Sequence, residues 1–171
     1  MSFFQIVLLI FVIFLCQTGQ VSAEDDIDMT LSETEKKAAF IASRIEIQFI
    51  DVETQYNLCV EFDSFYKNPI FIEGFKDKNK HHLDNANKFI WYLLNKLDKP
   101  SSEKLSATID NANERRRKRT KDNFIKETNE RKKAICLLHN YELLTGHWNI
   151  PDNEDTSIFN KINYGSNEHN K

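Results

Sequence analysis

Glycine and proline are scarce in this chain, which holds four of the first and three of the second in 171 residues. Turn-rich β-proteins use both residue types at their many tight turns, so this scarcity favours long helices. The net charge is also small, at −3, and gives no electrostatic reason to expect nucleic acid or a membrane as partner. We therefore expect an all-α protein.

Sequence motifs of catalysis are missing as well. The chain has no nucleophile elbow, phosphate-binding loop, Cys-x-x-Cys pair or zinc-protease motif. Without a recognisable catalytic constellation, the sequence favours a binding or structural role over an independent enzyme.

The first 23 residues carry no charged side chain. Within them the run 6–16 is wholly apolar, and Val21-Ser22-Ala23 has the small-x-small pattern that signal peptidase cleaves. An apolar run of this length suits a signal peptide and is too short to span a bilayer. The sequence therefore predicts a signal peptide at 1–23, a flexible acidic segment at 24–31, and a mature protein that is secreted or in the secretory pathway.

Cysteine is rare too, with three in the chain, and Cys16 lies inside the predicted signal peptide. Cys59 and Cys136 remain in the mature protein, which is too few for a disulfide-dense scaffold. They can form one bridge between two helices or stay as two buried free thiols, and the sequence leaves both alternatives open.

Two long amphipathic helices are indicated in the first half of the mature chain. The first begins with a capping box, Ser32-Glu33-Thr34-Glu35, and keeps apolar residues at helical spacing to about Phe62. The second begins at Asn68-Pro69, where Asn can cap the helix and Pro suits its first turn, and it ends at Asp98-Lys99-Pro100.

The second half is less regular. Segment 101–133 is charge-dense and is predicted as an insertion that can form a helix but cannot bury much of one. A third packed helix is expected from Ala134 to Thr145, before Gly146. The polar tail then holds one apolar patch and room for only the start of a fourth helix; the patch consists of Ile158, Phe159 and Ile162.

The second helix resembles that of the ferritins. There, a Phe-x-x-x-Phe run leads to a Glu-Glu-x-x-His iron site and a Lys-Leu-Ile-x-Tyr-Leu-Leu tail; here Phe71 and Phe75 match the pair and 88–94 matches the tail. Gln55-Tyr56-x-Leu58 similarly resembles part of the first ferritin helix. The resemblance implies a ferritin-like bundle of antiparallel long helices over 32–171, with an incomplete fourth helix. It also implies iron storage, with ferritin-type subunits as partners in a homo- or hetero-oligomer.

The iron ligands of that family are mostly replaced in this chain. A ferroxidase centre needs oxygen ligands from several helices plus one imidazole. Aligned on the tail, its glutamates fall on His81 and His82 and its histidine on Asn85, while other glutamates fall on Phe49 and near Leu138. The resemblance therefore implies a subunit without a working ferroxidase centre.

Four residues are the candidate metal ligands by position: His81, His82, Asp84 and Tyr56, with iron as the implied ion. Neighbouring histidines point about 100° apart on a helix, so one ion needs a further ligand to join them. The alternative is that these are solvated polar residues. His139 and His147 are interpreted as packing or surface histidines.

The run Arg115-Arg116-Arg117-Lys118-Arg119 has three interpretations. It can be a solvated face, a furin-like processing site with cleavage before Thr120, or a contact for a polyanion.

The predicted signal peptide, the helical pattern and the resemblance to ferritins together imply a secreted, ferritin-like iron-storage or iron-binding subunit. The alternative is a secreted helical interaction protein or effector on a degenerate scaffold of that kind.

Overall fold

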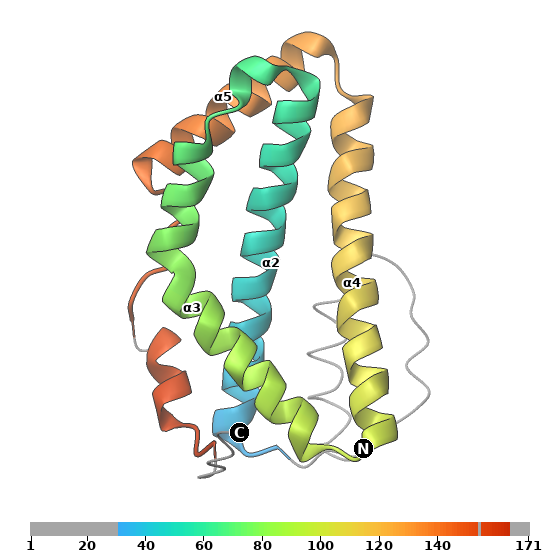
Figure 1. Cartoon of the computed structure of the whole chain (residues 1–171), viewed down its shortest axis with the longest axis vertical. Helices are drawn as coiled ribbons and strands as arrows, with labels where there is room; N and C mark the ends of the chain where they lie inside the picture. The colour runs from blue at the N-terminus through green and yellow to red at the C-terminus, as the bar shows by residue number, and fades with distance from the viewer. Residues whose placement is uncertain (1–30, 154, 165–171) are drawn as a thin grey trace.

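The computed structural model describes residues 31–153 and 155–164 (Figure 1). The predicted signal peptide and residues 24–30 of the predicted flexible segment lie outside these ranges. The described residues form four α-helices and two short 3₁₀ helices and no strand: α2 (Glu33–Phe62), η1 (Ser64–Tyr66), α3 (Pro69–Lys96), α4 (Lys99–Lys126), α5 (Asn129–Thr145) and η2 (Thr156–Lys161). The all-α prediction is confirmed. None of the described helices is long and apolar enough to cross a membrane.

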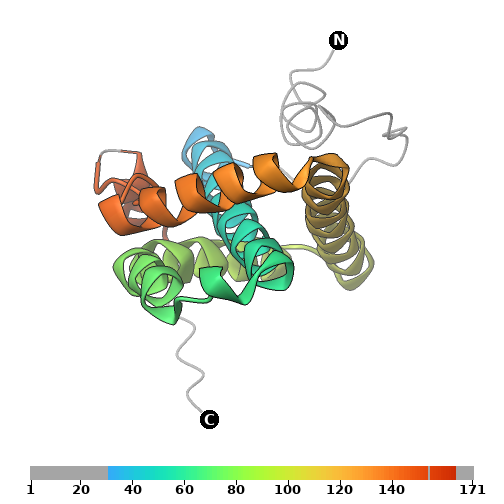
Figure 2. The ribbon, with the colours of Figure 1, turned by 90° about the horizontal axis from the view of Figure 1, so that it is seen from above.

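Three of the helices lie side by side and alternate in direction. In Figure 1, α2 runs upward through the middle, α3 returns downward beside it, and α4 rises on the other side. Helix α5 crosses behind the upper ends of the others, and the view from above shows it running from the top of α4 across α2 toward α3 (Figure 2). The central helix α2 therefore contacts α3, α4 and α5.

The helix starts are set by local side chains. The capping box at α2 is confirmed, since the Ser32 hydroxyl accepts from the Glu35 N–H and the Glu35 carboxylate accepts from the Ser32 N–H. Asn68 caps α3 as predicted, with its side chain accepting from the Ile70 N–H. Helix α5 ends at Thr145 and is capped by Gly146, whose φ of 74° lies in the left-handed region that glycine adopts without strain.

The prediction for residues 98–133 is wrong in one respect. Lys99 and Pro100 do not end the second helix; they begin α4, because the Asp98 carboxylate caps that helix and accepts from the Ser101 N–H at 2.8 Å. The predicted insertion is therefore most of one packed helix, α4, followed by the first turn of α5. The prediction that this charge-dense segment buries few residues is confirmed, since only Leu105 and Phe124 of α4 are buried.

The connectivity differs from the ferritin-like expectation. Ferritin-like bundles include one long crossover connection between helices. Here, α3 and α4 are separated only by Leu97 and Asp98, so α4 follows α3 after a short turn and packs mainly beside α2. The all-helical character is confirmed and the ferritin-like arrangement is not. The expected fourth helix is represented among the described residues by the six-residue η2.

The main core lies between α2, α3 and η2. Phe49 of α2 and Phe75 of α3 face each other with ring centroids 4.9 Å apart. Phe159 of η2 packs 5.9 Å from Phe89. The apolar patch predicted in the tail thus closes the lower part of the core; it consists of Ile158, Phe159 and Ile162.

Glu35 ties the start of α2 to the end of α3. Its carboxylate accepts hydrogen bonds from the Tyr92 hydroxyl and from Lys96 Nζ, each at 2.7 Å. Burial opposes ionisation, but the bonds from Lys96, Tyr92 and Ser32 together outweigh it and lower the pKa of Glu35 to about 2. The lower ends of the two helices are therefore fixed to each other by a charged group.

The upper end is fixed by a disulfide. Cys59 of α2 and Cys136 of α5 are bonded, 77 residues apart in sequence, inside a second small core that includes Phe124 of α4. Of the two alternatives left by the sequence, the bridge between helices is the one found. It joins the crossing helix to the central one.

Removing this bridge should cost much of the stability, because the bond closes a long loop in the unfolded chain. We expect the Cys59→Ser, Cys136→Ser double variant to lose about 4 kcal/mol of unfolding free energy. Urea titration of both proteins measures this. Equal stability of the two would show that α5 is held by packing alone.

Candidate metal site

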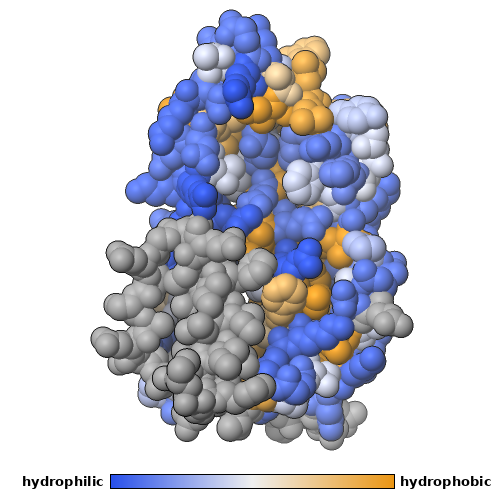
Figure 3. Space-filling model, turned by 180° about the vertical axis from the view of Figure 1, so that it is seen from behind, coloured by the Kyte–Doolittle hydropathy of each residue, from blue (hydrophilic) through white to orange (hydrophobic). Residues whose placement is uncertain are grey.

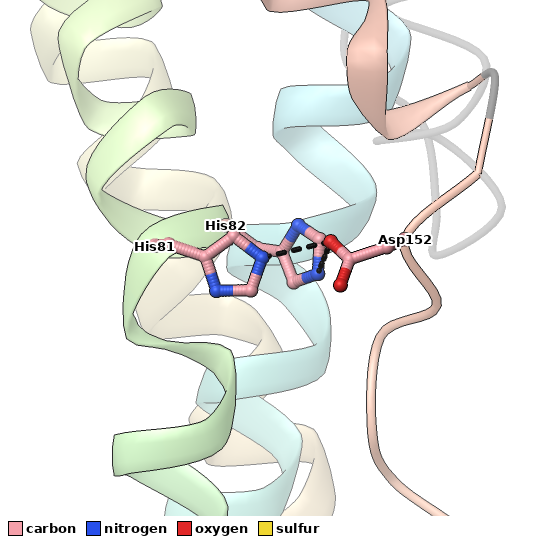
Figure 4. Close-up of side chains that lie close together, drawn as sticks. All are labelled: His81, His82 and Asp152. Atoms are coloured by element: carbon pink, nitrogen blue, oxygen red, sulfur yellow. Dashed lines mark hydrogen bonds and ion pairs between the residues drawn. The ribbon is translucent and has the colours of Figure 1, made fainter.

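Two neighbouring histidines of α3 meet an aspartate from the segment after α5 (Figure 4). His81 Nε2 lies 2.9 Å from Asp152 Oδ1, and His82 Nε2 lies 3.4 Å from the same oxygen. The His81 side chain is 53% exposed and that of His82 only 3%, while Asp152 is on the surface at 81%. The cluster thus extends from the core edge to solvent.

The segment that carries Asp152 is held by α3. Asn79, one turn before the histidines and 1% exposed, accepts from the Ile150 N–H at 2.6 Å. His82 Nε2 lies 3.1 Å from the Ile150 carbonyl oxygen. Gln48 of α2 donates to the Trp148 carbonyl oxygen of the same segment. The backbone of this segment is therefore fixed two residues before Asp152.

The charge states at neutral pH suit metal binding. Burial, with the neighbouring His81, lowers the pKa of His82, so its ring is held neutral. The hydrogen bond from His81 lowers the pKa of Asp152, which stays ionised. Neutral imidazole and ionised carboxylate are the forms that bind metal ions.

The geometry also suits an ion. One ligand atom from each of the three residues can be chosen so that all lie within 4.8 Å of one another. Zinc–nitrogen bonds of about 2.0 Å place two donors of a tetrahedral ion about 3.3 Å apart, close to the 3.4 Å between His82 and Asp152. Three protein ligands leave a fourth position open. The ion must replace both the hydrogen bond from His81 to Asp152 and the contact of the His82 ring with Ile150.

The four residues proposed from the sequence are only partly brought together. His81 and His82 are in the cluster, and the buried His82 is not the solvated residue of the alternative interpretation. Asp84 is outside the cluster and forms a surface ion pair with Lys80 at 2.8 Å. Tyr56 is a buried core residue, 8% exposed.

Asp152 was missed because no sequence signal connects it with the histidines. It lies 71 residues after His81, and only the fold of the segment following α5 places the two together. A position next to Pro151 in a polar tail is typical of any surface loop.

The other positions matched to ferritin ligands are dispersed. Phe49 lies in the aromatic core against Phe75, whereas Leu138 is 57% exposed on α5. His139 is a buried packing histidine, 4% exposed, and His147 lies on the surface, in agreement with the sequence interpretation.

The basic run lies in the second half of α4 and is not uniformly solvated. The Arg116 guanidinium donates two hydrogen bonds to the carboxylate of Asp51 in α2, from Nε to Oδ1 at 2.6 Å and from Nη2 to Oδ2 at 2.5 Å. Arg117 and Arg119 are exposed. The processing interpretation stays a prediction; cleavage before Thr120 requires opening of this helix, since proteases prefer exposed loops.

No family model, curated protein or solved structure matches this chain.

Protonation of His82 should destabilise the fold. The unfolded chain takes up this proton at its ordinary pKa of 6.5, whereas the folded chain resists it. The free energy of unfolding should therefore fall as the pH drops below about 6.5, by at most about 1.4 kcal/mol per pH unit for this group. Denaturant unfolding of the wild type and of His82→Gln between about pH 8 and about pH 5 measures it. The variant should lose less stability over this range; an equal loss in both proteins would contradict the assignment.

Proposed function

We propose that this chain is a secreted helical protein that binds a divalent transition-metal ion at His81, His82 and Asp152 without oxidising it. The observation that carries the proposal is the convergence of three ligand atoms, within 4.8 Å of one another, from segments far apart in sequence. The hydrogen bonds of Asn79 and His82 to Ile150 support it, because they hold the aspartate-bearing segment in position before any ion arrives.

Iron(II) and zinc are the ions proposed. Two imidazoles and one carboxylate suit both, and neither calcium nor magnesium prefers imidazole. The resemblance of residues 71–75 and 88–94 to ferritins favours iron. An iron-storage role within a ferritin-type assembly rests on that resemblance alone, and the short α3–α4 connection counts against it.

Calorimetric titration with zinc, and visible absorption with cobalt(II) as a spectroscopic substitute, test the site. A single ion should bind per chain, and His81→Ala and Asp152→Asn should each weaken binding by at least about tenfold. These two side chains are exposed, so their replacement should leave the fold intact. Aerobic iron(II) should be oxidised no faster than in buffer.

The matched control is Asp84→Asn, which removes a carboxylate close in sequence that lies outside the cluster. Its zinc affinity should equal that of the wild type. Undetectable binding by the wild type, or equal losses in Asp84→Asn and Asp152→Asn, would rule out the proposed site.

A second candidate is assembly of the chain with copies of itself, which the subunit interpretation requires and the interaction-protein interpretation allows. The observation that favours it is an exposed apolar stripe on α5, in which each side chain is at least 57% exposed: Leu137, Leu138, Tyr141 and Leu144. Figure 3 looks onto the side where α5 lies and shows hydrophobic atoms open to solvent among hydrophilic ones. A stripe along one helix is self-complementary about a two-fold axis, so a second copy is the occupant proposed.

Light scattering coupled to gel filtration measures the assembly. The wild type should have twice the mass of one chain, and Leu138→Lys should be monomeric. Ile70→Lys, at an exposed apolar residue of α3 outside this stripe, should leave the dimer unchanged. A monomeric wild type contradicts self-assembly, and a very large particle would instead support the ferritin-type interpretation.

A further inference from the structure

A cavity of about 470 Å³ lies between α2, α4 and α5, away from the histidine cluster. Three arginines of α4 and the indole of Trp148 are among the residues that line it. The arginines come to one side of α4 because Ala112, Arg116, Arg119 and Asn123 recur at spacings of four, three and four. This volume is within the range of about 300 to 1,000 Å³ that is typical of small-molecule sites.

The cavity is strongly cationic. Among the described residues that line it, Arg115, Arg116 and Arg119 outnumber the one carboxylate, that of Asp51. Asp51 holds the Arg116 guanidinium by two hydrogen bonds, which fixes its plane and leaves its other N–H groups to donate elsewhere. Arg119 is exposed. A guanidinium group held in this way is suited to carboxylates and phosphates, and Arg115 and Arg119 add positive charge beside it.

The lining also includes apolar side chains and a buried histidine. Ile47 and Trp148 contribute hydrophobic surface. His139 also lines the cavity, is 4% exposed, and its buried Nε2 has no hydrogen-bond partner among the described residues. Because this atom is closed off from solvent, it does not open onto the cavity, and His139 contributes to the wall by packing.

We propose that this cavity binds a small amphiphilic organic anion, with its carboxylate or phosphate at Arg115, Arg116 and Arg119 and its apolar body against Trp148 and Ile47. The positive charge of the three arginines favours an anion over an uncharged molecule. The surrounding helices limit the size of the ligand, which favours a small molecule over a polyanionic chain.

Decanoate and decyl phosphate are the probes. Decanol is the uncharged control, and inorganic phosphate is the control without an apolar chain. They are titrated into the protein secreted by cells expressing the whole reading frame, and binding is followed by calorimetry and by tryptophan fluorescence. Trp91→Phe removes the other tryptophan of the chain, an exposed residue of α3, so the signal comes from Trp148. One or both amphiphilic anions should bind at least about tenfold more tightly than decanol and inorganic phosphate.

Two variants of the same basic run separate a site from diffuse charge. Arg119→Gln should weaken anion binding at least about tenfold, because Arg119 lines the cavity. Arg117→Gln removes the same charge from an exposed position outside the lining and should bind as the wild type does. Asp152→Asn should also bind normally, since the metal cluster is separate.

Several results would overturn the proposal. Equal binding of decanol and decanoate would mean an apolar slot without anion recognition. Equal losses in Arg117→Gln and Arg119→Gln, or binding of heparin fragments but of neither probe, would mean a polyanion contact along the basic run. Inorganic phosphate binding as tightly as decyl phosphate would leave the apolar wall without a role.

Discussion

The hydrogen bond from the Ile150 N–H to the Asn79 side chain of α3 positions both proposed sites, and the contact of His82 with the Ile150 carbonyl oxygen supports it until an ion takes its place. Asn79 accepts from the Ile150 N–H and His82 contacts its carbonyl oxygen, so one residue of an otherwise irregular segment is held at both of its backbone polar groups. Asp152 lies two residues beyond and reaches the histidines; Trp148 lies two residues before and reaches the cationic cavity. Buried backbone groups must be paired, and this pairing is what positions the side chains on either side.

The helices that present this segment are fixed at both ends. Glu35 joins the lower ends of α2 and α3 through Tyr92 and Lys96. The bond between Cys59 and Cys136 joins α2 to α5 at the upper end. Both contacts relate elements far apart in sequence, so they restrict how α5 and the segment after it can lie against the other helices. The candidate sites are therefore assembled on rigid elements rather than on a free loop.

The sequence predicts features that depend on neighbouring residues, such as helix caps. It does not predict contacts between residues that are far apart in the chain. The caps at Ser32 and Asn68 follow from the chemistry of a few neighbouring residues, and both are confirmed. The sequence predicts a helix end at Asp98, although Asp98 caps the next helix, because a Pro-containing stop and a Pro-containing start look alike. Asp152 could not be paired with His81 from spacing, since only the tertiary fold brings them together.

An anomalous difference map from crystals grown with zinc decides whether the histidine cluster holds a metal ion. A peak is predicted about 2.0 to 2.2 Å from ring nitrogens of His81 and His82 and from a carboxylate oxygen of Asp152. The His82 ring should then have exchanged its contact with the Ile150 carbonyl for the ion. A map without a peak at this place, with the bond from His82 to Ile150 intact at saturating zinc, would contradict the account.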